Sequence, residues 1–579
     1  MKNAHLVRIT IILVALLHSR SLGAPPSLRV ALLGNPNTVP QWTDEQVQGL
    51  GDAGFNAVQL NVAWGSRPAD EPLNLNDVVG LPGEPLDPVV ANRQPELRKR
   101  IDLAKKHGLR TIFHFGSPFM WRNPDTGEIK RHAPDAHRGI WFDSANPKVV
   151  KYESALLKQF VKQFGDVDDI LVYTYDQDAW QASQFSSSSF SHGIPLHERL
   201  PRYIAALHEI WTKREGPAGS SKHTLWWEPW ELSAGQIYKI IPQLPTDNFG
   251  LSIHNNIAEA QIGKPVDLWY RTTAKLCRER GIPVIGEGYF CAETEEVQSL
   301  AIPCPRLVDE QFRAMTAVEG IVGVKEYFGV LPLVPDLNRA MFSARLKNPD
   351  ATTDHLLDQI SSRFGPKQAD VRKLCDDLAD AMQIMPFEAS WHLRLISKAS
   401  IDHGWTGATI HGNMADTPSW NSTRHAMFMQ CDNRQPHPDM LEDVQLRCEI
   451  AADHTAAAEK LLPGLIENTS GDDRAMFERL AKDLDHFRRV ATSFALHLRE
   501  TQLAMILRGD LQAAREMTPR CVDELKRLLD ADVENQHGQG RVVEMRDAFA
   551  ADPVKFMKEH LVPTETGKYE RGVFSLTTR

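Results

Sequence analysis

Acidic side chains follow short apolar runs at several points of the chain, and two of them stand close together. The segment Asp169–Trp180 begins as an apolar, β-branched run typical of a buried strand and then carries Asp176, Gln177 and Asp178. Because strand side chains alternate, Asp176 and Asp178 point the same way if the strand continues through Gln177. Such a pair can perform acid–base chemistry or bind a sugar. A solvated turn that caps the next helix is the simpler alternative.

Three more carboxyl groups, those of Glu228, Glu287 and Glu326, occupy the same kind of position. Glu287 lies between two glycines, which permit another group to approach closely, and packing alone gives no reason for a charge there. Glu228 precedes a proline and could serve only to hold a strand end by hydrogen bonds. Glu326 follows Lys325, so an ion pair between them is possible, although alternation favours opposite directions for the two side chains.

Neutral polar and aromatic residues accompany these acids. The residues at or near strand ends that could contact a substrate are Asn61, His114, His254, Trp180, Trp227, Trp230, Tyr289 and Tyr327. Aromatic faces pack on the C–H surface of a pyranose, and carboxylates and amides bind its hydroxyl groups, so the pattern favours a carbohydrate substrate. His114 and His254 are equally well explained as buried structural histidines.

The acids must be positioned by the strands that precede them. Eight strand-like runs alternate with helical patterns from residue 28 to residue 324; they begin at Leu28, Phe55, Leu109, Asp169, Thr224, Phe249, Ile282 and Ile321. Alternating strands and helices indicate a parallel sheet, and eight units close into a (β/α)8 TIM barrel over residues 25–345. An open doubly wound sheet is the alternative, but no Gly-x-Gly-x-x-Gly follows any strand.

Strand patterns stop after about residue 345, and the sequence predicts an all-α domain over residues 346–579. Its longest predicted helix, Arg474–Arg508, carries an apolar stripe from Phe477 to Leu498 and is expected to end at Gly509. Such a stripe is typical of a helix-bundle core. The Gly-, Trp- and His-rich segment His403–Trp420 could cover the barrel mouth or form a surface loop.

Composition limits the classes of function. The 579 residues carry a formal net charge of -10, with no sustained Lys/Arg run, which argues against a nucleic-acid partner. Residues 1–24 have the basic start, the short apolar run and the small residues of a signal peptide, so we expect a secreted or periplasmic protein without a membrane span; an uncleaved anchor is the alternative. Seven scattered cysteines lack zinc-site spacing, and we predict no metal and no organic cofactor. Export would permit disulfides, and Cys291 with Cys304 is one of the nearest candidate pairs.

A family resemblance adds to this interpretation. The segment Val324–Gly329, Val-Lys-Glu-Tyr-Phe-Gly, resembles a strand-end motif of the α-glucuronidases, and the stretch from Leu337 to Pro366 resembles their junction between barrel and helical domain. The resemblance implies that Glu326 activates water and that Asp176 or Asp178 replaces the family's fourth-strand glutamate. Paired acids at this strand are also similar to those of substrate-assisted hexosaminidases, although Gln177 separates the pair here.

We therefore predict a glycoside hydrolase that acts on a glycan containing uronic acid or N-acetylhexosamine. Asp178 is the expected general acid, Asp176 orients it or the substrate, and Glu287 or Glu326 is the opposing base or nucleophile. Two alternatives stay open: a glycan-binding barrel without catalysis, and a metal-dependent sugar isomerase or lyase in which the carboxylates and His254 would be ligands. The sequence does not assign the sugar, the linkage or the oligomeric state.

Overall fold

The structure is a computed structural model. It describes residues 26–34, 42–62, 74–80, 85–86, 88–116, 120–122, 129–131, 143–174, 190–214, 223–229, 232, 234–254, 262–263, 266–291, 300–386, 438–538 and 541–560. The expected signal peptide, residues 1–24, and the segment His403–Trp420 lie outside these residues.

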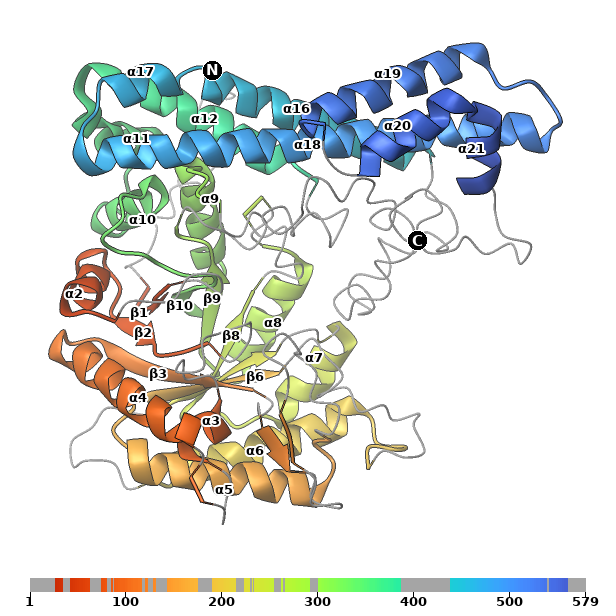
Figure 1. The fold of residues 1–579 in the computed structure, drawn as a ribbon. Helices are drawn as coiled ribbons and strands as arrows, with labels where there is room; N and C mark the ends of the chain where they lie inside the picture. The colour runs from red at the N-terminus through yellow and green to blue at the C-terminus, as the bar shows by residue number, and fades with distance from the viewer. Residues whose placement is uncertain are drawn as a thin grey trace, which may run out of the picture.

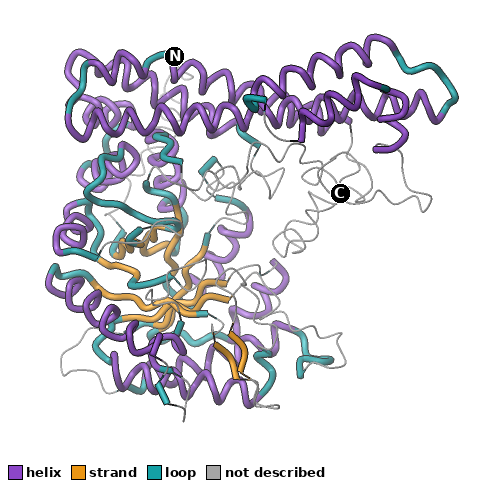
Figure 2. Tube along the Cα trace, in the orientation of Figure 1, coloured by secondary structure: helices purple, strands orange, loops and turns teal. Residues whose placement is uncertain are grey.

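Eight parallel strands form a closed barrel, which confirms the predicted fold (Figures 1 and 2). In chain order they are β1 (Leu28–Leu32), β2 (Ala57–Gln59), β3 (Arg110–Phe115), β6 (Asp169–Thr174), β7 (Leu225–Pro229), β8 (Phe249–Ile253), β9 (Val284–Gly288) and β10 (Ile321–Glu326). The barrel closes through pairing of β1 with β10. A short antiparallel pair that the sequence analysis did not predict, β4 (Met120–Arg122) with β5 (Ile129–Arg131), follows β3.

Helices connect and surround the strands. They are α2 (Asp44–Asp52), α3 (Leu75–Val79), α4 (Pro88–Lys106), α5 (Pro147–Phe164), α6 (Leu196–Thr212), α7 (Ala234–Ile240), α8 (Leu268–Glu279), α9 (Pro305–Thr316) and α10 (Leu337–Lys347). Side-chain caps fix several starts: Asp267 accepts a hydrogen bond from the Tyr270 amide, and Asp336 accepts one from the Asn338 amide.

A helical region follows the barrel, as predicted. Its helices are α11 (Thr353–Ser361), α12 (Gln368–Ile384), α16 (Pro438–Glu459), α17 (Leu462–Glu467), α18 (Gly471–Gln512), α19 (Pro519–Asn535), α20 (Arg541–Ala551) and α21 (Pro553–His560). Figure 1 shows α18 running the length of this region, above the barrel. The predicted end of this helix was wrong, because α18 continues through Gly509 to Gln512. A single glycine lowers helix stability by only about 1 kcal/mol, which the packing of a long helix overcomes.

The hydrophobic core does not stop where the barrel ends. One continuous cluster of buried apolar side chains extends from Ala31 in β1 to Leu498 in α18, and a second begins at Leu503 and includes α19, α20 and α21. The boundary predicted at residue 345 falls within α10. The extent of each domain therefore stays a prediction.

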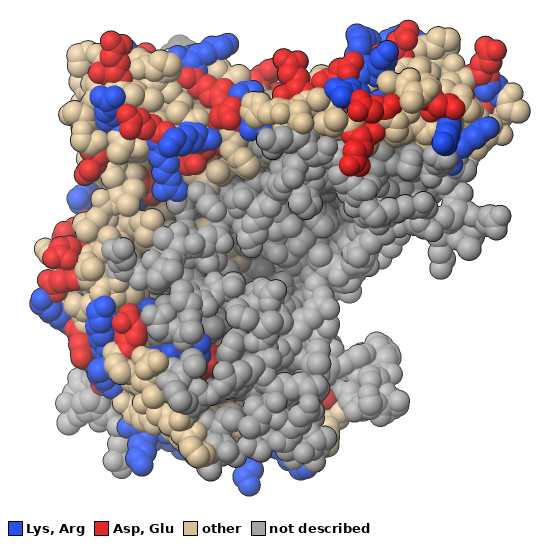
Figure 3. Space-filling model, in the orientation of Figure 1, with Lys and Arg blue, Asp and Glu red and all other residues tan. Residues whose placement is uncertain are grey.

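On the face shown in Figure 3, basic and acidic side chains are interspersed over the helical region. Several charged side chains of the helical region form exposed pairs one helical turn apart, such as Arg474 with Glu478 at 2.8 Å. Among the helices that the structure describes, none combines the length and apolar composition required to cross a bilayer.

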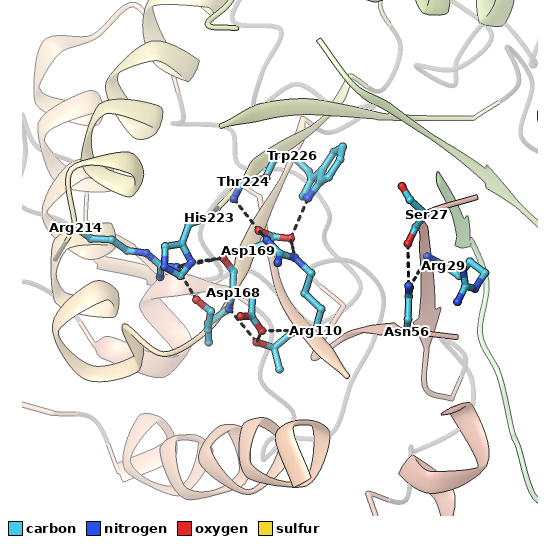
Figure 4. A network of polar contacts seen from close by, with 12 residues as sticks. Ser27, Arg29, Asn56, Arg110, Asp168, Asp169, Arg214, His223, Thr224 and Trp226 are labelled. Atoms are coloured by element: carbon cyan, nitrogen blue, oxygen red, sulfur yellow. Dashed lines mark hydrogen bonds and ion pairs between the residues drawn. The ribbon is translucent and has the colours of Figure 1, made fainter. Parts of the chain in front are cut away.

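The amino-terminal end of the barrel is held by a polar network (Figure 4). Arg110 donates two hydrogen bonds of 2.6 Å to the carboxylate of Asp169, which also accepts from the Thr224 amide and from the Trp226 indole. Burial raises the pKa of Asp169, although its pairing with Arg110 acts in the opposite direction. Polar pairing at this end of a barrel serves stability, while chemistry is expected at the other end.

Candidate active site at the carboxyl end of the barrel

A layer of polar side chains fills the barrel interior near the carboxyl ends of its strands. The penultimate residues of five strands contribute to it: His114 in β3, Glu228 in β7, Ser252 in β8, Glu287 in β9 and Lys325 in β10. Strand pairing places Lys325 beside Glu287, so both side chains point to the same face of the sheet. The layer beneath is apolar and includes Val30, Ile112, Leu171, Trp226 and Ile285.

Glu287 is the best-positioned carboxyl group in this layer. The Ser252 hydroxyl donates a 2.5 Å hydrogen bond to its Oε1, and Lys325 Nζ lies 3.4 Å from its Oε2. Glu287 is 0 % exposed and Lys325 only 4 %. Its flanking glycines have a clear steric role, since a Cβ at Gly288 would lie 2.9 Å from the Gln311 side chain and one at Gly286 would collide with the Tyr270 hydroxyl. The glycines thus let α8 and α9 pack against the outer face of β9, while Glu287 points inward.

Glu228 is a second buried carboxyl group, in a different electrostatic state. Burial raises the pKa of Glu228 well above its usual value, the negative charge of Glu287 raises it further, and Lys325 partly offsets both effects. Burial of Lys325 lowers its own pKa, but the charge of Glu287 and the hydrogen bond to it act in the opposite direction, and the pKa of Lys325 is raised. The layer therefore combines a protonated carboxyl group with a carboxylate–ammonium pair.

His114 links this layer to β2. The Gln59 amide donates to His114 Nδ1 at 3.1 Å and to the Asn61 carbonyl at 2.7 Å, so Nδ1 is the acceptor nitrogen of the ring. The proton is then on Nε2, which lies 3.8 Å from Glu228 Oε2. Burial lowers the pKa of His114 well below its usual value, and the charge of Lys325 lowers it further, so the ring is neutral.

Asn61 acts on the backbone beside that ring. Its side chain accepts from the His114 amide at 2.9 Å and donates to the His114 carbonyl at 2.6 Å. These two hydrogen bonds fix the backbone at the end of β3 and occupy both polar atoms of the Asn61 side-chain amide. Its assignment as a substrate-binding residue stays a prediction.

Glu326 points away from the polar layer. Its Oε2 accepts from the Phe290 amide at 2.9 Å, and its Oε1 accepts from the amides of Phe328 and Gly329 at 3.1 and 3.3 Å. Burial raises the pKa of Glu326 to about 7, with these amides acting in the opposite direction. The side chains of Lys325 and Glu326 point to opposite faces of the sheet, as expected. It is Lys325 that faces Glu287. Glu326 is positioned to fix the loops after β9 and β10.

Aromatic side chains gather just beyond the strand ends. The rings of Tyr289 and Tyr327 are 5.5 Å apart, and His254 lies 6.2 Å from Tyr327 and 6.1 Å from Trp269. Lys325 Nζ is 5.8 Å from the centre of the Tyr327 ring, which joins this cluster to the polar layer.

Trp227 does not join that cluster. It alternates with Trp226 and Glu228 along β7, and it belongs to the apolar cluster between barrel and helices, whereas Trp226 belongs to the barrel interior. We therefore leave Trp227 out of the candidate site. Four other predicted site residues, Asp176, Asp178, Trp180 and Trp230, lie outside the described residues.

Sequence reasoning missed Lys325, Ser252 and Gln59 as members of the site. The sequence suggested only an ion pair between Lys325 and Glu326. Alternation shows that consecutive side chains of a strand point to opposite faces, but it does not show which one faces the barrel interior. The inward direction of Glu287 could have supplied the missing information, but only if the register between the last two strands were known.

Metal-ligand geometry does not occur among the barrel side chains that the structure describes. Among all the residues that the structure describes, the one group of three His, Cys, Asp or Glu side chains with mutually close ligand atoms is in the helical region. The expected candidates for a disulfide near the barrel, Cys291 and Cys304, are buried thiols that do not form one.

Comparisons with known proteins agree on the architecture. No protein-family model matches the sequence, and none of the curated proteins matches it. Among solved structures, a GH138 enzyme targeting pectin rhamnogalacturonan II superposes with a TM-score of 0.56 at 12% identity, over 88% of this chain and 62% of the other. This chain therefore spans less than two thirds of that enzyme.

Two further structural matches are more distant. They are CpGH84B, with a TM-score of 0.41 at 11% identity over 92% of this chain and 77% of the other, and a Flavobacterium johnsoniae chitobiase, with 0.36 at 12% over 87% and 75%. At 12% identity the match with the GH138 enzyme concerns the fold alone and agrees with the TIM barrel described above.

Proposed function

We propose that this protein is a glycoside hydrolase in which Glu287 is the working carboxylate. The observation that carries the proposal is the contact of Glu287 with Lys325 and Ser252 inside the carboxyl end of the barrel. A lysine and a hydroxyl directed at one carboxylate fix its position and charge, which a nucleophile or general base requires. Active sites of TIM barrels occupy this end.

The two carboxyl groups of this layer lie in different electrostatic environments. The environment of Glu228 keeps it protonated, whereas Glu287 faces an ammonium group. Pairs of carboxyl groups whose environments differ in this way are typical of enzymes that combine acid and base chemistry near neutral pH. We assign Glu228 to substrate binding, as a neutral hydrogen-bond donor.

The general acid in this proposal is Asp178, with Asp176 as its supporting carboxyl group. Both follow β6, and β6 pairs with β7, the strand that carries Glu228. An acid delivered from this side and a nucleophile on β9 would flank a glycosidic bond across the barrel mouth. Glu326 is not proposed as the opposing carboxylate, because its two oxygen atoms accept three backbone hydrogen bonds on the other side of β10.

The proposed substrate is a glycan that contains uronic acid or N-acetylhexosamine, and the aromatic cluster of Tyr289, Tyr327 and His254 would contact its sugar rings. We also propose that the protein is exported, on the basis of its first 24 residues. Amino-terminal sequencing of protein recovered from outside the cytoplasm should begin near residue 25; protein that retains residue 1 would contradict export by cleavage.

The decisive experiment compares wild type with Glu287→Ala and Asp178→Ala on α- and β-linked 4-nitrophenyl glycosides, including uronides and N-acetylhexosaminides. Wild type should release 4-nitrophenol from one class, and Glu287→Ala should lose more than about a thousandfold in kcat/KM. Azide should restore turnover to Glu287→Ala as a glycosyl azide product if Glu287 is the nucleophile. Asp178→Ala should retain activity on this good leaving group and lose about 10²–10⁴-fold on unactivated glycosides.

Two outcomes would contradict the proposal. Release of product that is insensitive to both substitutions would place the chemistry elsewhere, and glycan binding without any product would favour a binding module. Each assay is run with EDTA, because activity that depends on added metal would support the isomerase or lyase alternative.

A further inference from the structure

A second cluster of potentially reactive side chains lies in the helical region, far along the chain from the barrel layer. His497 and Glu500 come from α18 and Asp532 comes from α19, and the two helices lie side by side in Figures 1 and 2. One nitrogen or oxygen of each side chain lies within 4.8 Å of one atom of each of the others. Glu500 and Asp532 are 0 % exposed and His497 is 5 % exposed.

We propose that His497, Glu500 and Asp532 bind a divalent transition metal, with zinc as the best match. One imidazole and two carboxylates are a set of ligands that zinc accepts, and the imidazole disfavours magnesium and calcium, which select oxygen. Ligand atoms at zinc stand about 3–4 Å apart for bonds of about 2.0–2.2 Å. The ligand atoms of the three side chains lie within 4.8 Å of one another, so a shared ion requires them to approach by about 1 Å.

The surrounding groups support a metal site in a second way. Ser493 donates to Asp532 Oδ1 at 3.0 Å, and Gln536 donates to Asp532 Oδ2 at 2.9 Å. Such hydrogen bonds orient the ligands of known metal sites. The carbonyl oxygen of the Gln536 side chain is buried and accepts no hydrogen bond from the described residues. Rotation of that amide would offer a fourth ligand; water is the other source.

The contact between His497 and Asp532 shows that two of the proposed ligands already face each other. His497 Nε2 lies 2.7 Å from Asp532 Oδ2, a hydrogen-bond distance that requires a proton between them. A metal ion bound by both side chains replaces that proton, which is released to solvent.

The ion would fasten α19 to α18. Asp532 is the only one of the three ligands on α19, and α19 belongs to the second apolar cluster, whereas His497 lies beside the end of the first. A metal at this point would join the two clusters. The proposed role is structural, because the three ligands are buried and the Gln536 side chain is available to close the fourth position.

The test uses the full-length protein, stripped with a chelator, reloaded with zinc and freed of excess ion by gel filtration. Mass spectrometry of the metal content should find about one zinc ion per chain, and reloading should raise the melting temperature. Cobalt in place of zinc should give visible absorption bands of a four-coordinate ion. A stripped protein that takes up neither ion would overturn the proposal.

Variants test the assignment of the ligands. Glu500→Gln preserves shape and should weaken zinc binding more than about tenfold in competition with a chromophoric chelator, and His497→Gln should do the same. Asp530→Asn, an exposed change on the same helix as Asp532, and Glu287→Gln, in the barrel, should bind zinc as wild type does. Equal affinity in Glu500→Gln, His497→Gln and wild type would show that the cluster is a hydrogen-bonded network alone.

Discussion

Lys325 Nζ lies 3.4 Å from Glu287 Oε2 inside the barrel, although the residue next to Lys325 carries the carboxyl group that sequence motifs favour. The register between β9 and β10 produces this pairing, since Lys325 lies opposite Glu287 and Glu326 lies opposite Gly288. The ion pair makes the charge of Glu287 dependent on its neighbour. The same pair supports the proposed nucleophile, and the catalytic role of Glu326 stays a prediction that substitution can test.

Replacement of Lys325 by methionine should change the pH dependence of the reaction. Without the ammonium group, the carboxylate of Glu287 is buried without its cation, which disfavours the ionised form of a carboxyl group. The acidic limb of the kcat/KM profile should move to higher pH and the maximal rate should fall. Lys325→Arg should recover part of both effects, and Lys347→Met, on the exposed surface, should leave the profile unchanged. An unmoved acidic limb in Lys325→Met would argue against Glu287 as the ionised group.

Glu326→Gln separates a supporting role from a catalytic one. The substitution places an amide donor beside backbone N–H groups that now donate to Glu326, so we expect a loss of about 1–3 kcal/mol in unfolding free energy. The activity of the folded fraction should stay within about tenfold of wild type. Urea unfolding and active-site titration measure the two effects. A loss of activity as large as that of Glu287→Ala, with unchanged stability, would restore Glu326 as a catalytic residue.

Glu153 in α5 should make stability depend on pH. Burial raises the pKa of Glu153 to about 8, above its usual value of 4.5, so the folded state holds a proton that the unfolded state has lost between these limits. Stability then falls as pH rises through that window, by up to ~1.4 kcal/mol per pH unit. Glu153→Gln should remove this slope and stabilise the protein more at pH 8 than near pH 5. Thermal melts across that pH range measure the slope, and Glu198→Gln, on the exposed surface of α6, is the control. An equal effect of Glu153→Gln at both pH values would refute the assignment.

Arg345 should be among the most sensitive positions at the junction of barrel and helical region. Its Nε and a terminal nitrogen contact the two Asp309 oxygens at 2.5 and 2.8 Å, and its other terminal nitrogen donates to the carbonyls of Pro349 and Ala351. Removal of one partner from a buried pair costs about 3–5 kcal/mol, so Arg345→Met should lower the unfolding free energy by that amount. Arg474→Met breaks an exposed pair and should cost less than about 1 kcal/mol. Similar losses in both variants would contradict this ranking.

The sequence was sufficient to predict the barrel, because each strand is a short apolar run bounded by helical patterns, and closure follows from eight such units. It also marked Glu287, through the unexplained charge between two glycines. It did not predict the side of the sheet on which Glu326 lies, since that depends on the register between β9 and β10. The short pair of β4 and β5 was missed because its strands have three residues each and show little periodicity.

Prediction was weakest where tertiary packing overrides local preference. Gly509 marks a helix end in the sequence, yet α18 continues through it because its last turns pack on α19 and α21. Trp227 was expected at the mouth on the basis of residue type, and alternation along β7 directs it outward instead. Both differences come from contacts between distant segments that single-residue preferences do not contain.

Helix α18 contributes 42 residues without a break, which corresponds to about 63 Å at 1.5 Å per residue. Its first part belongs to the core that includes the barrel, and its last turns belong to the separate core formed with α19, α20 and α21. A continuous helix keeps its two ends in a fixed relative orientation, whereas a linker of flexible residues would allow them to rotate. The core formed with α19, α20 and α21 is therefore joined to the core that includes the barrel by a continuous helix, which restricts how the two can move relative to each other.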